Sequence, residues 1–259
     1  DDDIINSLYF SFNCNGYIDN IVKIQKLVKN NKINYCNFAS NNENTVFKNS
    51  YYGHLINNEK IVKNSYDLSK NMILTGPNAA GKTTLLKSSI FNIILCQQFG
   101  CGFFEEATIN LYDYIHCYIN IPDTSNRDSL FQAEARQCKK ILELIEDNSD
   151  KRHFCVFDEL YSGTNPDEAV SSAFNYLKHL DIFNNLDYIL TTHYNKLCKK
   201  LEKSKSNVTN YCMTIKQNDS KSDFEYTYKL KKGISKVKGG IKVLKDLNYP
   251  KEIIKYFKN

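Results

Sequence analysis

The chain has 259 residues, of which 42% are hydrophobic and 24% are charged, and its formal net charge is +5. This length can bury a full core, as one large domain or as a domain with an appendage, and the composition is ordinary for a globular protein. The modest positive charge permits an anionic partner without demanding one. No apolar run is long enough to cross a bilayer, and the acidic start is no signal peptide. We therefore expect an intracellular protein without a membrane partner.

Cysteine and methionine usage adds two expectations. The nine cysteines stand singly, without a CxxC pair, which favours buried reduced thiols over disulfides or zinc ligands. The methionines are Met72 and Met213, and the chain begins with three aspartates. We expect a chain without an initiator methionine to be a piece of a longer protein.

The first predicted element is a helix at residues 17–29. Its apolar side chains recur at helical spacing and are Ile18, Ile21, Val22, Ile24, Leu27 and Val28. The pattern predicts an amphipathic helix with a basic outer face, and we expect the apolar stripe to belong to the core rather than to a partner site. Residues 38–50 are polar and rich in asparagine, which predicts a connecting loop or a boundary.

From about residue 51, short apolar runs alternate with longer helical patterns. Strands are predicted at 72–76, 112–121, 153–160 and 187–194, and helices at 82–99, 129–147 and 167–180. Strands that alternate with helices indicate an α/β fold, with a mostly parallel sheet flanked by helices. Residues 223–233 then alternate like a strand, and 239–248 and 250–258 are predicted to form two short helices.

A phosphate-binding loop is predicted between the first of these strands and the helix that follows. Residues 76–83 read "GPNAAGKT" and fit G-x-x-x-x-G-K-[ST], a motif that requires a strand before it and a helix after it. Lys82 would lie along the β- and γ-phosphates, and the Thr83 hydroxyl would ligate Mg²⁺. Backbone amides at the helix start would point at phosphate oxygens. The predicted nucleoside triphosphate site comprises Gly76, Pro77, Asn78, Ala79, Ala80, Gly81, Lys82, Thr83 and Thr84.

Two further strand ends carry polar residues that suit this site. The run "FCVFDE" ends a buried strand with Asp158 and Glu159, and "ILTTHY" places His193 after another strand. Asp158 would hold Mg²⁺, directly or through water, and Glu159 would act as the base or position the attacking water. His193 is a candidate for sensing the γ-phosphate. A solvated strand end and a structural histidine are the alternatives, and the phosphate loop upstream favours the functional interpretation.

In their order and spacing, these motifs resemble the ATPase domain of the MutS family of DNA mismatch-repair proteins, an ABC-type branch of the P-loop proteins. The likeness rests on "GPNAAGKT", on "FCVFDE" followed by a "GT" turn, and on "THY". It extends upstream to "YIDNIVKIQKLVKNNKINYC" and downstream to "PKEII". The run "SLFQAE" is similar to the signature region of the family, with Ser129, Phe131 and Glu134 at its serine, phenylalanine and acidic positions.

The resemblance implies a Mg²⁺-dependent ATPase in which two such domains face each other, in a homodimer or a heterodimer. Each ATP would lie between the phosphate loop of one protomer and Ser129 of the other. Asn78 would help to place the γ-phosphate or the water. Tyr228 would stack on the adenine; the alternative is that it is an ordinary tyrosine of a strand.

The implied organisation is the end of a helical core or lever at 1–45, an ATPase domain at 46–232, and a C-terminal helical dimerisation segment at 233–259. Nucleotide-dependent closure of the dimer would control a clamp on DNA, held by domains outside this chain.

Two departures from the family pattern leave other functions open. Residues 161–164 read "YSGT" where "GRGT" is usual, and Leu130 follows the signature serine where threonine is usual. A MutS-like ATPase without mismatch recognition, with a role in recombination, at branched DNA or in regulation, is the main alternative. Another ABC-type ATPase is less favoured, because "RDSLFQAEA" replaces the LSGGQ-like signature of those proteins.

Overall fold

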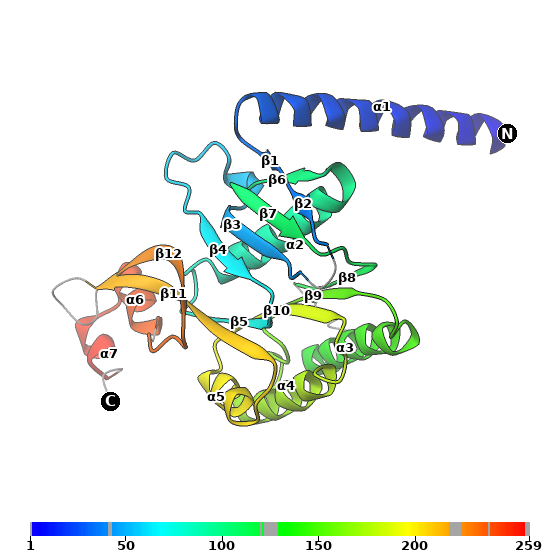
Figure 1. Ribbon diagram of the computed structural model, residues 1–259. Coiled ribbons are helices and arrows are strands. Elements are labelled where there is room, and N and C mark those ends of the chain that lie inside the picture. Colours follow the sequence, from blue (N-terminus) through cyan, green and yellow to red (C-terminus); the bar gives the residue numbers. More distant parts are fainter. Residues whose placement is uncertain are drawn as a thin grey trace.

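A computed structural model describes residues 2–40, 43–119, 121, 129–217, 224–237 and 239–256. Its central sheet has six strands in the order β12-β11-β5-β10-β9-β8 (Figure 1). Neighbouring strands from β11 to β8 are parallel, and β12 is antiparallel to β11. The strands are β5 (Asn71–Thr75), β8 (Tyr114–Tyr118), β9 (His153–Asp158), β10 (Leu186–Thr192), β11 (Val208–Gln217) and β12 (Phe224–Lys232). The predicted α/β class with a mostly parallel sheet is confirmed.

Side chains of the central strands alternate between two cores, one on each face of the sheet. Ile73, Phe157 and Leu190 enter one core, and their neighbours Leu74 and Val156 enter the other. Because both faces are covered, these strands consist of nearly continuous apolar runs. This burial on both faces explains why the three central strands are easy to locate in the sequence.

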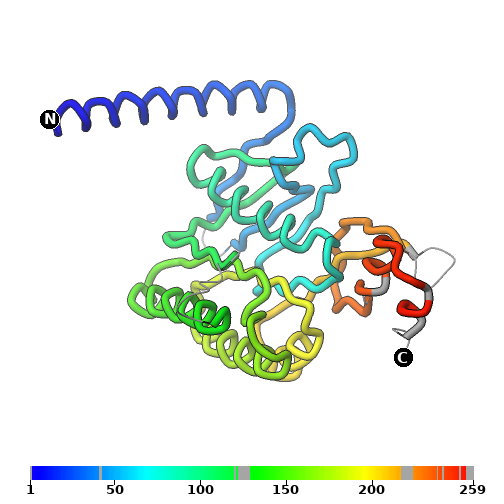
Figure 2. The backbone as a smooth tube through the Cα atoms, turned by 180° about the vertical axis from the view of Figure 1, so that it is seen from behind, coloured from blue at the N-terminus to red at the C-terminus, as the bar shows by residue number. Residues whose placement is uncertain are grey.

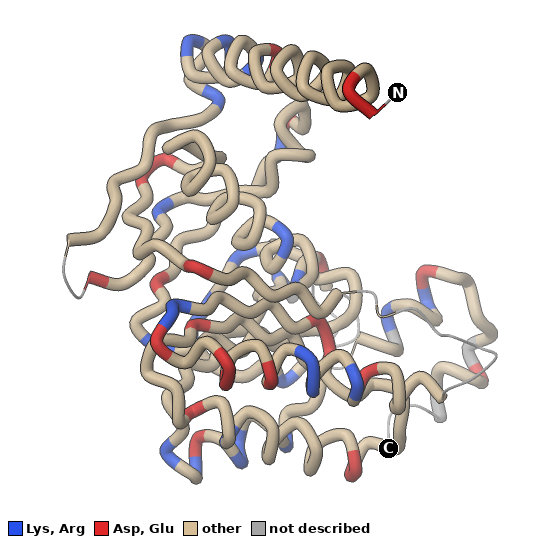
Figure 3. The backbone as a smooth tube through the Cα atoms, turned by 90° about the vertical axis from the view of Figure 1, so that its right-hand side faces the viewer, with Lys and Arg blue, Asp and Glu red and all other residues tan. Residues whose placement is uncertain are grey.

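Helices cover both faces of the sheet. Helix α2 (Lys82–Phe99) lies between the six-stranded sheet and a second sheet, whereas α3 (Leu130–Asp147), α4 (Pro166–Leu180) and α5 (Asn195–Lys203) cover the opposite face (Figures 1 and 2). Local signals set two of the helix starts. Ser129 and Gln132 form a capping box before α3, and Asn165 caps α4 ahead of Pro166. Basic and acidic residues are interspersed along the outer helices (Figure 3).

A second, four-stranded sheet has the order β2-β7-β3-β4 and was not predicted. Its strands are β2 (Asn37–Phe38), β3 (Val46–Ser50), β4 (Asn64–Asp67) and β7 (Glu106–Ile109), while β1 (Asn34–Tyr35) pairs with β6 (Cys101–Gly102) and a 3-10 turn spans Gly53–Leu55. The expected loop at 38–50 is therefore wrong in its second half. There Phe47 points into the core and packs against Tyr66 and Phe104, a contact hidden in the sequence by the surrounding asparagines.

Helix α1 corrects a second expectation. It spans Asp2–Lys29, longer than the predicted 17–29, and has no buried residue. Ile18, Ile21 and Val22, which were expected in the core, are exposed. Figures 1 and 2 show the reason, because α1 projects from the body of the molecule, and its ring contact with the body is that of Tyr17 with Phe99. Periodicity identified the helix correctly but not what it packs against.

The remaining elements differ from the expectations mainly in their ends. Strand β8 is shorter than the predicted 112–121, and β11 was not predicted at all. Helices α6 (Gly240–Asp246) and α7 (Lys251–Tyr256) confirm the two predicted C-terminal helices. Residues 257 and 258 of the second predicted helix, and residue 223 of the predicted strand before them, lie outside the residues that the structure describes. The predicted domain boundary between residues 45 and 46 stays a prediction. Strands β1 and β2 precede this boundary and pair with β6 and β7, which follow it.

The nine cysteines are all free, and five of them are buried, namely Cys96, Cys101, Cys138, Cys155 and Cys198. Burial of these five agrees with the expected buried thiols, whereas Cys36 and Cys212 are partly exposed and Cys14 and Cys117 are exposed. Among the helices that the structure describes, none has the length and apolarity of a membrane span.

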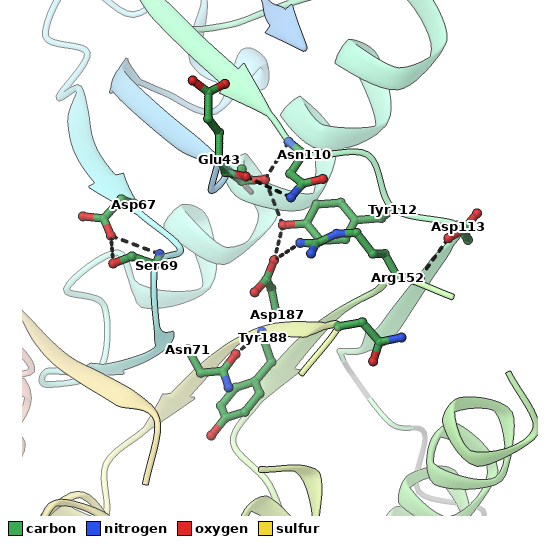
Figure 4. A network of polar contacts seen from close by, with 12 residues as sticks. Glu43, Asp67, Ser69, Asn71, Asn110, Tyr112, Asp113, Arg152, Asp187 and Tyr188 are labelled. Atoms are coloured by element: carbon green, nitrogen blue, oxygen red, sulfur yellow. Dashed lines mark hydrogen bonds and ion pairs between the residues drawn. The ribbon is translucent and has the colours of Figure 1, made fainter. Parts of the chain in front are cut away.

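A polar network links the four-stranded sheet to the central sheet (Figure 4). The Tyr112 hydroxyl and Arg152 Nη2 both donate to Oδ2 of Asp187, at 2.8 and 2.7 Å. Tyr112 also shares a 2.9 Å hydrogen bond with the hydroxyl of Thr45, next to β3. Burial raises the pKa of Asp187, and Tyr112 and Arg152 oppose the shift. The carboxylate therefore depends on these two donors to stay charged at the junction.

Candidate nucleotide site

Three neighbouring strands end at the same edge of the central sheet. Thr192 of β10 pairs with Thr75 of β5, and Thr191 pairs with Asp158 of β9. The phosphate loop, Glu159 and His193 directly follow these strand ends. Ligands of α/β sheets usually bind at the carboxyl ends of adjacent strands. The fold thus brings together three motifs that are far apart in the sequence.

The phosphate loop joins β5 to α2 through two left-handed residues. Ala79 has a φ of 62° and Gly81 a φ of 93°. Gly81 is the N-cap of α2, and a Cβ at this position would lie 3.1 Å from the ring of Tyr228. Glycine meets both the backbone conformation and the close approach. The free N–H groups at the start of α2 are thereby available to an anion, as the motif requires.

The Lys82 side chain lies inside this loop and is only 6% exposed. Its Nζ donates to the carbonyl oxygens of Gly76 and Pro77, at 3.0 and 3.3 Å, and lies 3.8 Å from Oε1 of Glu159. Burial lowers the pKa of Lys82, and the charges of Glu159 and Asp158 oppose that shift. The ammonium group is therefore fixed at the inner side of the loop, next to the acidic pair.

Thr83, the first residue after Lys82, faces Asp158. Its hydroxyl donates to Oδ2 of Asp158 at 3.0 Å, and the hydroxyl of Thr191 donates to Oδ1. A hydroxyl and a carboxylate are hard oxygen donors, and Mg²⁺ in nucleotide sites takes one or two such protein ligands beside water and phosphate oxygens. Thr83 and Asp158 therefore fit a magnesium site.

Glu159 lies between the lysine and the histidine. Its backbone is left-handed, with a φ of 57°, and its Oε2 lies 3.5 Å from Nδ1 of His193. The hydrogen bond with His193 is the main cause that lowers the pKa of Glu159; the charges of His193 and Lys82 act in the same direction, and burial opposes them. Glu159 is thus an ionised acceptor with its two oxygens directed at Lys82 and His193.

One cavity of about 690 Å³ connects most of the predicted site residues. It is lined by Asn78, Ala79, Gly81, Lys82, Thr83, Thr84, Asp158, Glu159 and Tyr228, and by Tyr118, Ile121, Leu130, Glu134 and Ser162. A neighbouring cavity of about 490 Å³ lies on the other side of the loop, where Gly76, Pro77 and His193 meet Ser235 and Lys236. The phosphate loop therefore separates two hollows, with Asn78 and Glu159 on the border of both.

Two predicted site residues line neither of these two cavities, namely Ala80, which is buried, and Ser129. Ser129 is exposed, and its hydroxyl accepts a hydrogen bond of 3.3 Å from the backbone N–H of Gln132 as the cap of α3. Its neighbours Leu130 and Glu134 do line the cavity. Whether Ser129 acts on the nucleotide of a second protomer stays a prediction.

An apolar hollow of about 310 Å³ was missed by the sequence analysis. Tyr52, Leu55, Ile61 and Val62 line it together with Gly81, Thr84 and Tyr228. This hollow opens beside the phosphate loop, and its size and its apolar lining suit a flat aromatic group. The apolar pair Ile61–Val62, isolated among polar residues just before β4, is the signal that could have revealed it.

Comparison with known proteins agrees with this geometry. A family model described as MutS domain V matches residues 72–259. The DNA mismatch repair protein MutS of Phocaeicola vulgatus is 31% identical over 76% of this chain and 23% of its own length. The DNA mismatch repair protein MSH3 of Debaryomyces hansenii is 27% identical over 88% of this chain and 20% of its own length. Endonuclease MutS2 of Staphylococcus aureus is 29% identical over 60% of this chain and 22% of its own length. The chain thus spans between a fifth and a quarter of these relatives, and it belongs to the MutS family, with residues 72–259 forming domain V, the C-terminal ATPase domain.

Proposed function

We propose that this chain binds ATP with Mg²⁺ and hydrolyses it, as the ATPase domain of a MutS-like protein of DNA mismatch repair. The observation that carries the proposal is the arrangement at the 690 Å³ cavity, where Thr83 meets Asp158 and where Glu159 lies between Lys82 and His193. Domain V and the mismatch-repair relatives support the same proposal.

Binding follows from the loop and the start of α2. The backbone N–H groups of Ala80, Gly81 and Lys82 would hold the β- and γ-phosphates, and the ammonium of Lys82 would neutralise them. Thr83 and Asp158 would hold Mg²⁺, which supplies positive charge to the phosphate oxygens as the leaving group departs. In this arrangement, Lys82 exchanges its hydrogen bonds with the loop carbonyls for hydrogen bonds with phosphate.

Hydrolysis requires mainly positioning and charge stabilisation. An ionised Glu159 can accept a hydrogen bond, and then a proton, from a water molecule beside the γ-phosphate. His193, whose Nδ1 lies 3.5 Å from Oε2 of Glu159, would hold that carboxylate in place, and as an imidazolium it would also donate from Nε2 to a γ-phosphate oxygen. Asn78, on the border of two cavities, would orient the water or the phosphate from the other side.

The apolar hollow next to the loop is the proposed adenine site. Tyr228 lines both this hollow and the phosphate cavity, and 44% of its surface is exposed. Its ring lies where a Cβ on Gly81 would approach it to 3.1 Å, and it could stack on a base whose other face lies on Ile61 and Val62. A nucleotide would thus extend from the apolar hollow over Gly81 to Lys82.

A second protomer would complete the site. Ser129 would reach the γ-phosphate of the other protomer, so that binding of ATP closes the dimer and hydrolysis opens it, which would control a clamp on DNA. Light scattering on the Glu159→Gln variant with and without ATP and Mg²⁺ tests this step. An ATP-dependent dimer supports the composite site, and a monomer under both conditions contradicts it.

The replacement Lys82→Ala tests nucleotide binding itself. We expect it to abolish tight binding of ATP in a fluorescence titration, because the buried ammonium is the main positive charge of the loop. The control is Lys140→Ala at an exposed position of α3. Unchanged affinity in Lys82→Ala would show that the loop does not bind the phosphates.

The Glu159→Gln variant tests the chemical step. The amide cannot accept a proton, so we expect ATP binding to persist while steady-state hydrolysis falls about 100-fold or more. Glu146→Gln, on the outer side of α3, is the control. Hydrolysis at the normal rate in Glu159→Gln would remove this residue from the mechanism.

The alternative function is that of a MutS-like ATPase without mismatch recognition, and the similarity to endonuclease MutS2 supports this alternative. Binding of the full-length protein to mismatched, branched and fully paired DNA distinguishes the two. A preference for mismatched DNA supports the first function, and a preference for branched DNA or none supports the alternative.

A further inference from the structure

The carboxylate of Glu134 joins helix α3 to the loop that follows Asp158 and Glu159. Its Oε1 accepts hydrogen bonds from the backbone N–H and the hydroxyl of Ser162, at 3.0 and 2.8 Å, and its Oε2 accepts from the N–H of Gly163, at 3.0 Å. The Glu134 residue is only 2% exposed. Three uncharged donors therefore hold a buried carboxylate at the edge of the nucleotide cavity.

The loop held in this way has a backbone that needs support. Glu159 and Tyr161 both have a φ of 57°, in the left-handed region that non-glycine residues rarely adopt. Such residues persist when their surroundings hold them in place. Glu159 is one of the two, so whatever fixes residues 160–163 also fixes the carboxylate that faces Lys82 and His193.

Helix and loop are in direct contact at this point. A Cβ on Gly163 would lie 2.7 Å from Cγ of Leu130 and 2.7 Å from the backbone nitrogen of Phe131. The rings of Phe131 and Tyr161 lie 5.7 Å apart. A side chain at residue 163 would clash with the start of α3, so the first turn of this helix packs directly against the loop.

We propose that Glu134 is a positioning residue that couples the first turn of α3 to the catalytic Glu159 of the same chain. Ser129 caps that same turn, five positions before Glu134. A force on Ser129, such as contact with a nucleotide held by a second protomer, passes through the Glu134 carboxylate to Ser162 and Gly163 and from there to Glu159. This inference rests on the proposed function and adds to it a route within one chain from the dimer interface to the hydrolytic group.

The test is Glu134→Gln. The amide oxygen keeps the bonds from Ser162, but its NH₂ group faces the N–H of Gly163, so one hydrogen bond is replaced by a donor–donor contact. We expect kcat to fall about tenfold or more, while the affinity for ATP stays within twofold and ATP-dependent dimerisation persists. Glu143→Gln on the exposed side of α3, where Glu143 pairs with Lys139, is the matched control and should hydrolyse normally.

Ser162→Ala is the second variant, because it removes one hydrogen bond and leaves the buried carboxylate with its two backbone donors. We expect kcat to fall about threefold without a change in ATP affinity. Normal kcat in both variants would overturn the inference. A parallel loss of ATP affinity and kcat would also overturn it, since it would indicate a general structural role. Failure of the wild-type protein to bind or hydrolyse ATP would instead refute the proposed function.

Discussion

The hydroxyl of Thr83 donates a 3.0 Å hydrogen bond to Oδ2 of Asp158, a residue 75 positions away in the chain. Thr83 lies in the first turn of α2, which the phosphate loop connects to the end of β5, and Asp158 ends β9, two strands away from β5 in the sheet. Thr191 of the intervening β10 donates to the other oxygen of the same carboxylate. The sheet order alone therefore places the two proposed magnesium ligands side by side.

This contact predicts that the variant Asp158→Asn needs more Mg²⁺ for ATP binding than the wild type. An amide keeps the shape of the side chain but loses the negative charge, so we expect the Mg²⁺ concentration needed for half-maximal ATP binding to rise about tenfold or more. The measurement is a titration of ATP binding with Mg²⁺. Asp167→Asn, at an exposed position of α4, should leave the requirement unchanged. An equal Mg²⁺ requirement in Asp158→Asn and the wild type would exclude Asp158 as a ligand.

If Tyr228 stacks on the adenine, replacing it should weaken binding of ATP but not of a triphosphate without a base. Removal of the ring in Tyr228→Ala should weaken ATP binding by about 1–3 kcal/mol, since that is the usual contribution of an aromatic ring stacked on a base. Tyr228→Phe keeps the ring and should bind ATP almost normally. Inorganic triphosphate, which has no base, should bind all three proteins equally. Loss of triphosphate binding in Tyr228→Ala would show instead that the replacement disturbs Gly81 and the phosphate loop.

The meeting of the three motifs at one edge of the central sheet could be predicted from the sequence because their signals are local. The phosphate loop and His193 each follow a strand that is buried on both faces, and Asp158 and Glu159 lie at the end of another; such strands stand out as apolar runs. The contact of Glu134 with Ser162 and Gly163 could not be predicted, because it joins a helix to a loop without a pattern in either segment.

The four-stranded sheet escaped prediction for a similar reason. Its strands have two to five residues, and their partners are distant in the chain, as when Asn37 pairs with Thr108. Periodicity needs longer runs than these. The exposed face of α1 shows the converse, since an apolar pattern predicts a helix but not the surface that it contacts.

The junction between the two sheets gives a prediction about stability. In Tyr112→Phe, the loss of the hydroxyl leaves both Thr45 and the buried Asp187 without one partner, so we expect the free energy of unfolding to fall by about 1–3 kcal/mol. Urea denaturation measures this change. Tyr35→Phe, at a position that is 69% exposed, should change the stability little. Equal loss in both variants would mean that the network does not stabilise the junction.

A buried pair of histidines predicts loss of stability in mild acid. His153 Nε2 lies 2.9 Å from the backbone oxygen of Asn148, which can only accept, so this nitrogen carries the hydrogen. The Nδ1 of His153 then accepts, and His116 Nε2 donates to it over 3.0 Å. Both side chains are buried, and burial is the main cause that lowers the pKa of His116 from 6.5 to about 4, with a smaller contribution from His153.

The direction of the pH dependence follows from the lowered pKa. The unfolded chain takes up a proton at His116 near pH 6.5, whereas the folded protein resists it until about pH 4, so stability falls as the pH is lowered through this window. The full effect is about 3 kcal/mol. The variant His116→Gln keeps a donor for His153 and cannot titrate. Urea denaturation at pH 7.5 and 4.5 measures the free energy of unfolding, which should fall less between these two pH values in this variant than in the wild type. His179→Gln, an exposed position on α4, is the control and should lose as much stability as the wild type. The same acid loss in His116→Gln and His179→Gln would assign the sensitivity to other groups.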